Sequence, residues 1–444
     1  MTTAPPSDAA ADITHRRILS IALPMTLAYA STPLLGIVDT TIIGRLGRAD
    51  LLGGLAIGAI LFDIVFSTFN FLRAGTTGLA AQAKGAGKKE EIGTIFFRAL
   101  SLGVLCGIVV VALSPLILNA GLWLMGPSAE VADAVTRYFE IRVLSAPFAL
   151  ANYAILGWYL GLARSGVALT LQILLNATNI ALNIALVVGL GLSIEGVAWG
   201  TVIAEAMTAI VGTILVLRHL GPDRWHYLRG VFEASRLAPF FALNRDIMIR
   251  SLCLVFAFAW FTRMGTGLGE TMLAANAILM NFFLLASFIL DGFAAAAEQL
   301  SGEMLGARRK QAFIRATKIV LFWGLGFATV LTILFLAFGD AAIGLMTTND
   351  DVRSAASSFI FWAAITPILC VAAFHFDGVF IGATWSDDMR NMMLVSTVSF
   401  VALSLALVPT FGNLGLWIAM SAFFALRGLT LAIRFPVRAA RSFT

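Results

Sequence analysis

Polar and charged residues divide this 444-residue chain into twelve long apolar stretches. Each stretch is long enough to cross the hydrocarbon core of a bilayer, which takes about 20 residues in a helix. Lipid offers the backbone no hydrogen-bond partner, so each stretch is expected to be an α-helix. The expected spans are 16–43, 53–80, 94–118, 132–161, 168–188, 197–217, 239–263, 271–297, 316–338, 355–382, 392–409 and 416–434. The pattern therefore predicts an all-α integral membrane protein with twelve transmembrane helices.

The second half of the chain repeats the glycine pattern of the first half. The matched positions are Gly75, Gln82 and Gly85 with Gly292, Gln299 and Gly302, and Gly157 and Gly161 with Gly378 and Gly382. A duplicated hydrophobic chain predicts two six-helix lobes related by an internal pseudo-twofold repeat, a layout typical of transporters. A polar connection with the turn signal Gly221-Pro222-Asp223 separates the halves. We expect an N-terminal lobe at 1–220, a cytoplasmic linker at 221–236 and a C-terminal lobe at 237–444.

Composition agrees with this class, because 59% of the residues are hydrophobic and 12% are charged. A soluble domain carries about twice that share of charge. Basic residues gather in both tails and in the even-numbered connections, which predicts cytoplasmic termini and a multi-pass protein of the cell inner membrane. Anionic lipid headgroups explain these thinly spread charges, so no nucleic-acid partner is expected. The cysteines and histidines show no metal-ligand spacing, and neither a metal nor an organic cofactor is expected.

One acid lies within the first apolar stretch. Asp39 follows Gly36-Ile37-Val38, and its counterpart in the second half is Phe261. A charged side chain at the centre of a membrane helix costs about 2.5–3.5 kcal/mol on insertion scales, so Asp39 must face water or polar partners. Pro24 and Pro33 precede Asp39 in the same stretch, and proline weakens a helix locally. The alternatives are a working hinge at Pro24, which would move Asp39, and a static kink.

The fifth stretch carries four amides at helical spacing. Gln172, Asn176, Asn179 and Asn183 are separated by 4, 3 and 4 positions, which places them on one face of a helix. Such a face lines a cavity or holds helices together through hydrogen bonds, and we favour the cavity. Shorter polar stripes are Asp63, Ser67 and Asn70 in the second stretch and Thr201, Glu205 and Thr208 in the sixth. A further polar group, expected to form interfacial salt bridges, comprises Arg137, Glu140 and Arg142.

Several segments make the chain resemble the multidrug and toxic compound extrusion (MATE) family, in its DinF-like branch. They are Val38-Asp39-Thr40 with Gly44-Arg45-Leu46-Gly47, Leu72-Arg73-Ala74-Gly75-Thr76-Thr77-Gly78-Leu79, Leu290-Asp291-Gly292-Phe293, and Phe376-Asp377-Gly378-Val379-Phe380-Ile381-Gly382-Ala383-Thr384. The resemblance covers essentially all twelve expected helices. It implies secondary active export, driven by the inward flow of protons or sodium.

The resemblance also implies roles for particular residues. Asp39 matches the acid implicated in cation coupling, and Pro24 matches a proline associated with bending of the first helix. The positions that help to form the polar site are matched by Asn179, Asn183 and Thr201. Some relatives carry an aspartate where this chain has Asn183. Hard cations favour charged oxygen ligands, so the amide weakens a sodium site and favours protons.

These observations predict a cation-coupled antiporter, driven by protons rather than sodium, that exports amphiphilic or cationic small molecules by alternating access. The four amides and Thr201 are the expected positions for substrate or cation binding. The alternatives are a sodium-coupled exporter of the same fold, a flippase for lipid-linked precursors and a passive channel. A flippase needs a basic cavity, for which the candidates are Arg73, Arg245, Arg250 and Arg263. No nucleophile–base or metal constellation indicates an enzyme. We expect a monomer within the lipid bilayer.

Overall fold

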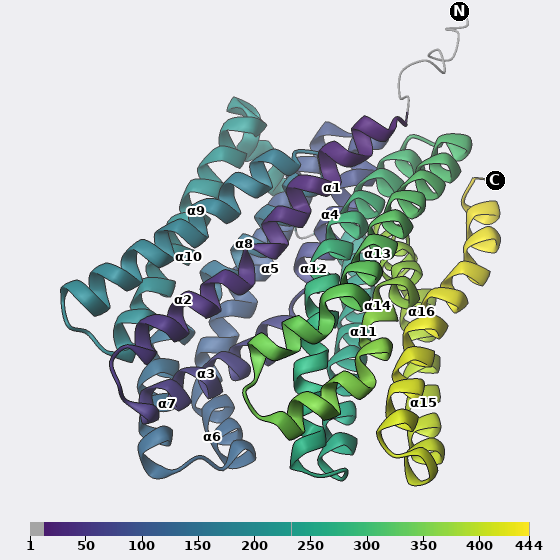
Figure 1. Ribbon diagram of the computed structural model, residues 1–444. Coiled ribbons are helices and arrows are strands. Elements are labelled where there is room, and N and C mark those ends of the chain that lie inside the picture. The colour runs from purple at the N-terminus through teal and green to yellow at the C-terminus, as the bar shows by residue number, and fades with distance from the viewer. Residues whose placement is uncertain (1–12, 232, 444) are drawn as a thin grey trace, which may run out of the picture. The chain divides into compact units, whose positions relative to one another are not determined.

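The computed structural model describes residues 13–231 and 233–443, and within these residues it contains helices and turns but no strand. Twelve of its helical segments are long and apolar enough to cross a membrane. Each overlaps one of the twelve predicted apolar stretches, although the third span ends at Ala112, before the predicted end at residue 118. The predicted all-α fold with twelve spans is therefore confirmed (Figure 1).

Several spans of the first half of the chain are interrupted or end in irregular turns. The first half contains α1 (His15–Ala30), α2 (Thr32–Gly44), α3 (Ala49–Thr68), α4 (Phe71–Gly85), α5 (Lys89–Ala112), α6 (Ser114–Met125), α7 (Ala129–Arg142), the 3-10 turn η2 (Val143–Ser145), α8 (Ala146–Gly161), α9 (Ser165–Asn183), the π-helical turn η3 (Ile184–Gly189), α10 (Ile194–Leu220) and the 3-10 segment η4 (Pro222–Gly230). The first span thus comprises α1 and α2, and the second comprises α3 and α4. The fourth span is divided by η2, and the fifth ends in η3.

Each of the six spans of the second half is a single uninterrupted helix. They are α11 (Ala234–Thr266), α12 (Glu270–Gly306), α13 (Lys310–Met346), α14 (Asp350–Gly382), α15 (Ser386–Phe411) and α16 (Asn413–Ser442). The duplication therefore preserves the number of spans, while the two halves differ in the continuity of their helices.

The break in the first span has a local cause. Pro33 occupies the first turn of α2, where a missing backbone N–H does no harm, and the preceding helix ends just before it. Ser31 lies at the break, and its hydroxyl donates a 2.7 Å hydrogen bond to the carbonyl of Ala28. Pro24, the predicted hinge, lies inside α1, which continues through it.

The backbone itself shows the duplication. Four residues of the first half with φ in the left-handed region recur 221 or 222 residues later. The pairs are Gly47 and Gly269, Gly87 and Arg308, Ala163 and Thr384, and Gly191 and Gly412. Each pair closes corresponding turns between helices. The turns therefore keep their backbone conformation even where a side chain has replaced glycine.

The repeated glycines mark close helix crossings. A side chain at Gly157 of α8 would collide with the carbonyl of Arg73 in α4, and one at Gly378 of α14 would collide with the carbonyl of Ala294 in α12. Both members of the second pair lie 221 residues after those of the first. Small residues let membrane helices approach backbone to backbone, which explains this part of the sequence repeat.

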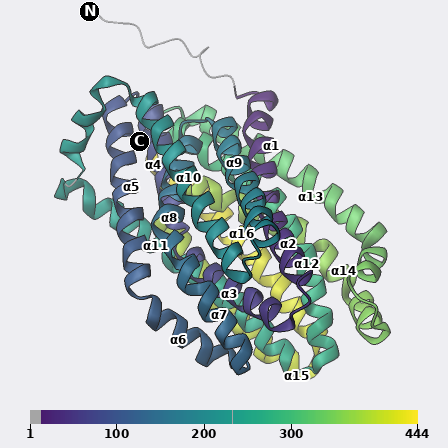
Figure 2. The same ribbon diagram turned by 90° about the vertical axis from the view of Figure 1, so that its left-hand side faces the viewer.

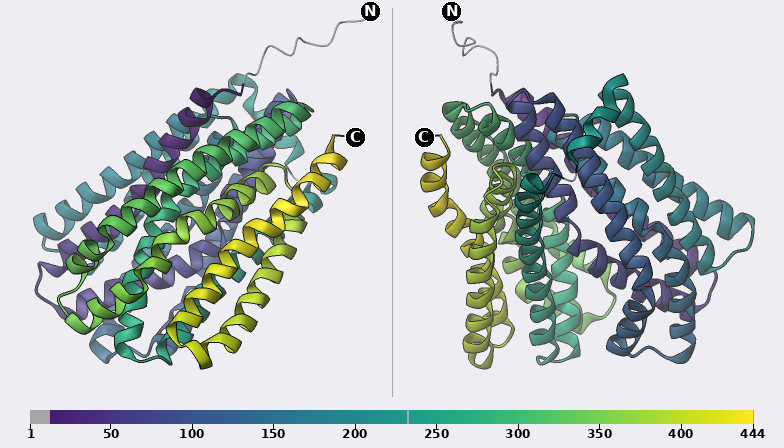
Figure 3. Two further views of the ribbon diagram at one scale, coloured as in Figure 1. Left: turned by 45° about the vertical axis from the view of Figure 1, so that its right-hand side comes forward. Right: turned by 180° about the vertical axis from the view of Figure 1, so that it is seen from behind.

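The chain forms two compact units. The first holds the chain up to Thr26, Ala81–Gly87 and Ala257–Thr444, and the second holds Leu27–Ala80 and Lys88–Phe256. In the first unit α14 packs against α12, α13 and α16, and α15 packs against α16 (Figures 1 and 3). In the second unit α8 packs against α5 and α10, and α7 packs against α3 and α10 (Figure 2). The predicted boundaries of the lobes stay a prediction.

Within the first unit, the carboxylate of Glu303 connects α12 with α1 and α4. Glu303, near the end of α12, pairs with Arg17 of α1 at 2.7 Å and with Lys84 of α4 at 2.9 Å. Gln299, one turn earlier, donates a hydrogen bond to the same carboxylate. The Glu303 side chain is 13% exposed, so these bonds are shielded from water. The ends of α1 and α4 are thereby fixed to α12.

The substitution Glu303→Gln should lower the apparent melting temperature of the purified protein by a few degrees. Removing the charge leaves the two cations without their shared partner, at a cost of about 1–3 kcal/mol. Glu270→Gln is the control, because Glu270 is an exposed residue of the same helix. Equal melting temperatures for the two variants would show that the Glu303 cluster contributes no stability.

Candidate functional site

Asp39 lies on α2, eight residues after the break in the first span, and its side chain is partly buried. Its carboxylate Oδ1 accepts a hydrogen bond from Asn183 Nδ2 of α9, with 2.6 Å between the two atoms. Hydrogen bonds to an ionised group are shorter and stronger than those between neutral groups. This bond offsets part of the cost of a charge within a membrane-crossing helix.

The bond to Asp39 continues as a line of hydrogen bonds into α9 and α10. Asn183 Nδ2 also donates to Asn179 Oδ1 at 3.0 Å, and Asn179 Nδ2 donates to Thr201 Oγ1 at 2.9 Å. The Thr201 hydroxyl in turn donates to the carbonyl of Val197 at 3.1 Å. The structure thus brings four of the sequence-predicted site residues together in one network across three helices.

The fit around Asn183 is close. A side chain at Gly200 of α10 would collide with Asn183 Oδ1, so only glycine lets α10 approach the amide. Asn183 is fully buried, and its Oδ1 has no hydrogen-bond partner. A buried acceptor without a partner is unusual and costly. The π-helical turn η3 begins directly after Asn183, and turns of this kind are frequent at functional sites.

The other two amides on this face of α9 form hydrogen bonds near the break in the first span. Gln172 Nε2 donates to Asn176 Oδ1 at 3.0 Å. Asn176 Nδ2 donates to Ser31 Oγ at 2.7 Å and to the Ser31 carbonyl at 3.3 Å. The amide face of α9 therefore contacts the first span both at its break and at Asp39. Pro24 lies ahead of this break, inside α1.

The second half keeps a related helix contact without the charge. Trp260 Nε1 of α11 donates to Ser404 Oγ of α15 at 2.8 Å. Ser404 is the counterpart of Asn183, and Trp260 precedes Phe261, the counterpart of Asp39. Phe261 is buried against Trp417, with 5.3 Å between the ring centroids. In this half, indole and aromatic packing take the place of the carboxylate and the amides.

Two further carboxylates belong to the same compact unit as Asp39. Glu205 of α10 accepts a 2.6 Å hydrogen bond from Asn152 Nδ2 of α8, and the same Nδ2 lies 3.1 Å from the Glu205 carbonyl. Asn152 is 4% exposed. Asp63 lies on α3. The sequence indicated both acids as members of polar stripes but supplied no partner for either.

The expected interfacial salt bridges are only partly present. Arg137 pairs with Glu195 at 2.6 Å and with Asp133 at 3.0 Å. Arg142, the last residue of α7, instead lies over the ring of Phe62, 4.8 Å from its centroid. It also lies 5.8 Å from the centroid of Tyr138. The four-residue spacing of Tyr138 and Arg142 is the sequence signal that predicts such a contact on a helix.

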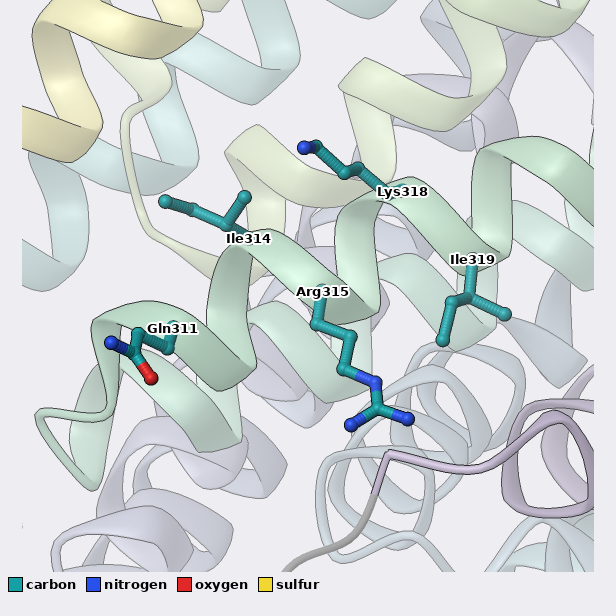
Figure 4. A pocket seen from close by; sticks show the side chains of 5 residues that line it. All are labelled: Gln311, Ile314, Arg315, Lys318 and Ile319. Atoms are coloured by element: carbon teal, nitrogen blue, oxygen red, sulfur yellow. The ribbon is translucent and has the colours of Figure 1, made fainter.

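Two other polar features of the described residues lie outside this network. Asp377 of α14 pairs with Arg427 of α16 at 2.8 Å, and both side chains are buried. A surface pocket follows α13 and is lined by Gln311, Ile314, Arg315, Lys318 and Ile319. Figure 4 shows that all five side chains come from this one helix. The pocket lining offers no carboxylate that could exchange a proton.

Known proteins identify the family. The MatE family model matches residues 24–211 and 247–409, which is most of the chain. The chain belongs to the multidrug and toxic compound extrusion family. This family comprises ion-coupled antiporters for drug efflux, and its members are multi-pass membrane proteins rather than enzymes.

Relatives of this MATE transporter support the same assignment. DNA damage-inducible protein F of Escherichia coli (strain K12) is 38% identical over 93% of this chain and 90% of that protein, which confirms the DinF-like branch. Multidrug resistance protein PmpM of Pseudomonas aeruginosa is 26% identical over 96% of this chain and 91% of that protein. A crystal structure of a MATE protein in the bent conformation is 17% identical, with a TM-score of 0.88 over 96% of both chains. That structure shows the same fold.

The substitution Gly200→Ala should reduce transport at least about tenfold, since an added methyl group displaces the Asn183 amide from Asp39. Alanine is otherwise favoured over glycine in a helix by about 1 kcal/mol. Dye movement in liposomes and the melting temperature would be measured together. Gly166→Ala, where the added methyl group meets no neighbour, is the matched control. Parent-like transport by Gly200→Ala would contradict a functional role for this close fit.

Proposed function

We propose that this MATE transporter exports amphiphilic or cationic small molecules in exchange for protons, and that Asp39 is the coupling acid. The observation that supports this best is the line of hydrogen bonds from Asp39 through Asn183 and Asn179 to Thr201. It joins the only carboxylate of the first span to the amide face of α9 and to α10. A change of charge at Asp39 therefore acts on three helices.

Protonation changes the hydrogen bonding at Asp39 directly. The ionised carboxylate only accepts, and it accepts here from Asn183 Nδ2. A protonated carboxyl group can donate through its O–H, while the amide N–H₂ can only donate. The amide then turns or moves away, and its buried Oδ1 becomes the acceptor that a protonated Asp39 needs. The two protonation states thus favour different positions of α2 against α9.

The break in the first span allows the local change in hydrogen bonding at Asp39 to cause a larger movement of the helix. Asn176 holds Ser31 at the break, and Asn183 holds Asp39 beyond it. The segment between these two anchors is short, and a helix without a continuous backbone ladder bends at low cost. Bending of the first span, with Pro24 as a second weak point, would transmit the protonation of Asp39 to the helices that enclose the substrate.

The choice of a proton over sodium follows from the ligands. Asn183 and Asn179 are neutral amides, so Asp39 is the only charged oxygen ligand in the line. Small hard cations are bound in proteins by several oxygen ligands, among which carboxylates predominate. A proton needs one carboxylate only. The site therefore fits a proton better than sodium, which remains the alternative coupling ion.

Names of relatives and the composition support the substrate class. One relative is named a multidrug resistance protein. The chain has 34 phenylalanines and 14 methionines, side chains that offer adaptable walls for amphiphilic or cationic compounds. The basic connections and tails favour cytoplasmic termini in the inner membrane. We retain a monomer as the functional form.

The flippase alternative has less support. Arg245 is paired with Asp246 at 3.0 Å, and Arg73 donates to Asn70 Oδ1 at 3.3 Å. Their charges are engaged by neighbouring side chains. A diphosphate headgroup is recognised by a cluster of free cations, and these two arginines do not provide one.

The substitution Asp39→Asn should reduce transport driven by a pH gradient to the background of empty liposomes. An amide cannot take up the proton that drives the cycle. The melting temperature and the gel-filtration profile should stay close to those of the parent. Asp340→Asn, which changes an exposed carboxylate of α13, is the control and should transport normally. Transport by Asp39→Asn at the parent rate would remove Asp39 from the coupling mechanism.

The substitution Asn183→Asp should make transport respond to a sodium gradient. It places a second carboxylate against Asp39 and so provides the charged oxygen pair that a hard cation favours. Asn176→Asp adds the same charge beside Ser31 and should gain no sodium response. Fluxes would be recorded with the sodium and pH gradients imposed separately. A folded Asn183→Asp variant that ignores sodium would show that the number of carboxylates does not decide the ion.

A further inference from the structure

A positive charge is held between aromatic rings in the same compact unit as Asp39. The guanidinium of Arg142 lies over Phe62 and Tyr138, whose side chains are each 1% exposed. Arg142 Nε is buried and has no hydrogen-bond partner. Arginine keeps its charge throughout the accessible pH range, so this is a fixed cation in a largely apolar setting.

Three acids on three different helices belong to the same compact unit as this cation. The charge of Arg142 interacts with Asp39 of α2, Asp63 of α3 and Glu205 of α10. The packing explains why. Ile42 and Ile43 of α2, Phe62 of α3 and Tyr138 of α7 belong to one apolar cluster. Charges act over longer distances in such surroundings than in water. Tyr138 of α7 and Tyr153 of α8 interact electrostatically with the same charges, and Tyr153 also with Arg73 of α4. The other charged or titratable side chains of α3, α7 and α10 are Asp50, Glu130, Asp133, Arg137, Glu140, Glu195, Arg218 and His219.

We propose that Arg142 is a specificity-determining residue whose fixed charge keeps sodium out and promotes the release of the coupling proton. This inference rests on the proposed function. A bound cation of either kind is repelled by the guanidinium, and the penalty is similar for both. Its consequences differ, however. Sodium binding is already weak, and the guanidinium weakens it until sodium no longer binds at useful concentrations. The proton is held tightly, and the same repulsion lets Asp39 release it on the opposite side of the membrane.

A purely structural role for Arg142 predicts something else. The stem of arginine packs against apolar neighbours, and its loss can disturb packing without any effect of charge. Methionine keeps most of that stem and loses the charge, while lysine keeps the charge and a comparable stem. If packing alone matters, R142M and R142K should behave alike. If charge matters, they should differ.

The test measures dye transport by purified protein in liposomes, with pH and sodium gradients imposed independently. The parent and R142K should be driven by the pH gradient and should ignore sodium. In R142M the pH of half-maximal transport should rise by about one unit, the usual effect of removing one nearby charge. One pH unit corresponds to a tenfold change in affinity, so the apparent sodium affinity should also rise about tenfold.

The outcomes separate this inference from the function on which it rests. If the parent shows no transport driven by a pH gradient and Asp39→Asn changes nothing, the proposed function fails. If both behave as expected while R142M keeps the parent pH profile and ignores sodium, only the role of Arg142 fails. It also fails if R142K behaves like R142M.

A second variant covers the case in which R142M does not fold. Asp63→Asn removes one of the negative charges that Arg142 balances. The pH of half-maximal transport should then move down, in the direction opposite to that of R142M. An unchanged midpoint in folded Asp63→Asn protein would overturn the proposed charge balance.

Discussion

The hydrogen bond between Asp39 and Asn183 is the interaction on which the site depends. A carboxylate within a membrane-crossing helix costs about 2.5–3.5 kcal/mol unless polar partners receive it. Here the amide of Asn183 donates a hydrogen bond to the carboxylate. The need to position this amide explains the structural features around it. Gly200 gives it room, Asn179 orients it, and the π-helical turn begins directly after it. The buried charge of Asp39 is a single physical cause for all of these features.

The internal duplication shows what happens when this constraint is absent. In the second half, Trp260 and Ser404 join the corresponding helices, and the spans run without a break. In the first half, the spans are interrupted at several points. An irregular backbone exposes polar groups, which a membrane protein tolerates only where protein or water receives them. The amide face of α9 contacts Asp39 through Asn183 and the broken backbone at Ser31 through Asn176, so polarity and irregularity occur together.

The sequence predicted those features that depend on local patterns. The twelve spans follow from runs of apolar residues, and the amide face of α9 follows from helical spacing alone. Other features needed partners far along the chain. The break at Ser31 is stabilised by Asn176, which lies 145 residues away, so the local sequence does not show this contact. From the sequence alone, Pro24 was therefore as good a candidate for the bend in the first span as the residues at the break. Arg142 was assigned to an interfacial salt bridge because its aromatic partner Phe62 lies on another helix.

The proposed mechanism also explains how one ion can drive the export of dissimilar compounds. The proton would change only the hydrogen bonds between Asp39 and the amides, so the energy it delivers does not depend on which substrate is bound. Amides suit this task because each can both donate and accept, and a line of them can reverse its direction without leaving a charge unpaired. Substrate recognition is then left to apolar and aromatic side chains, whose contacts need no fixed geometry. Separating the two tasks lets the cavity be permissive while the coupling stays strict.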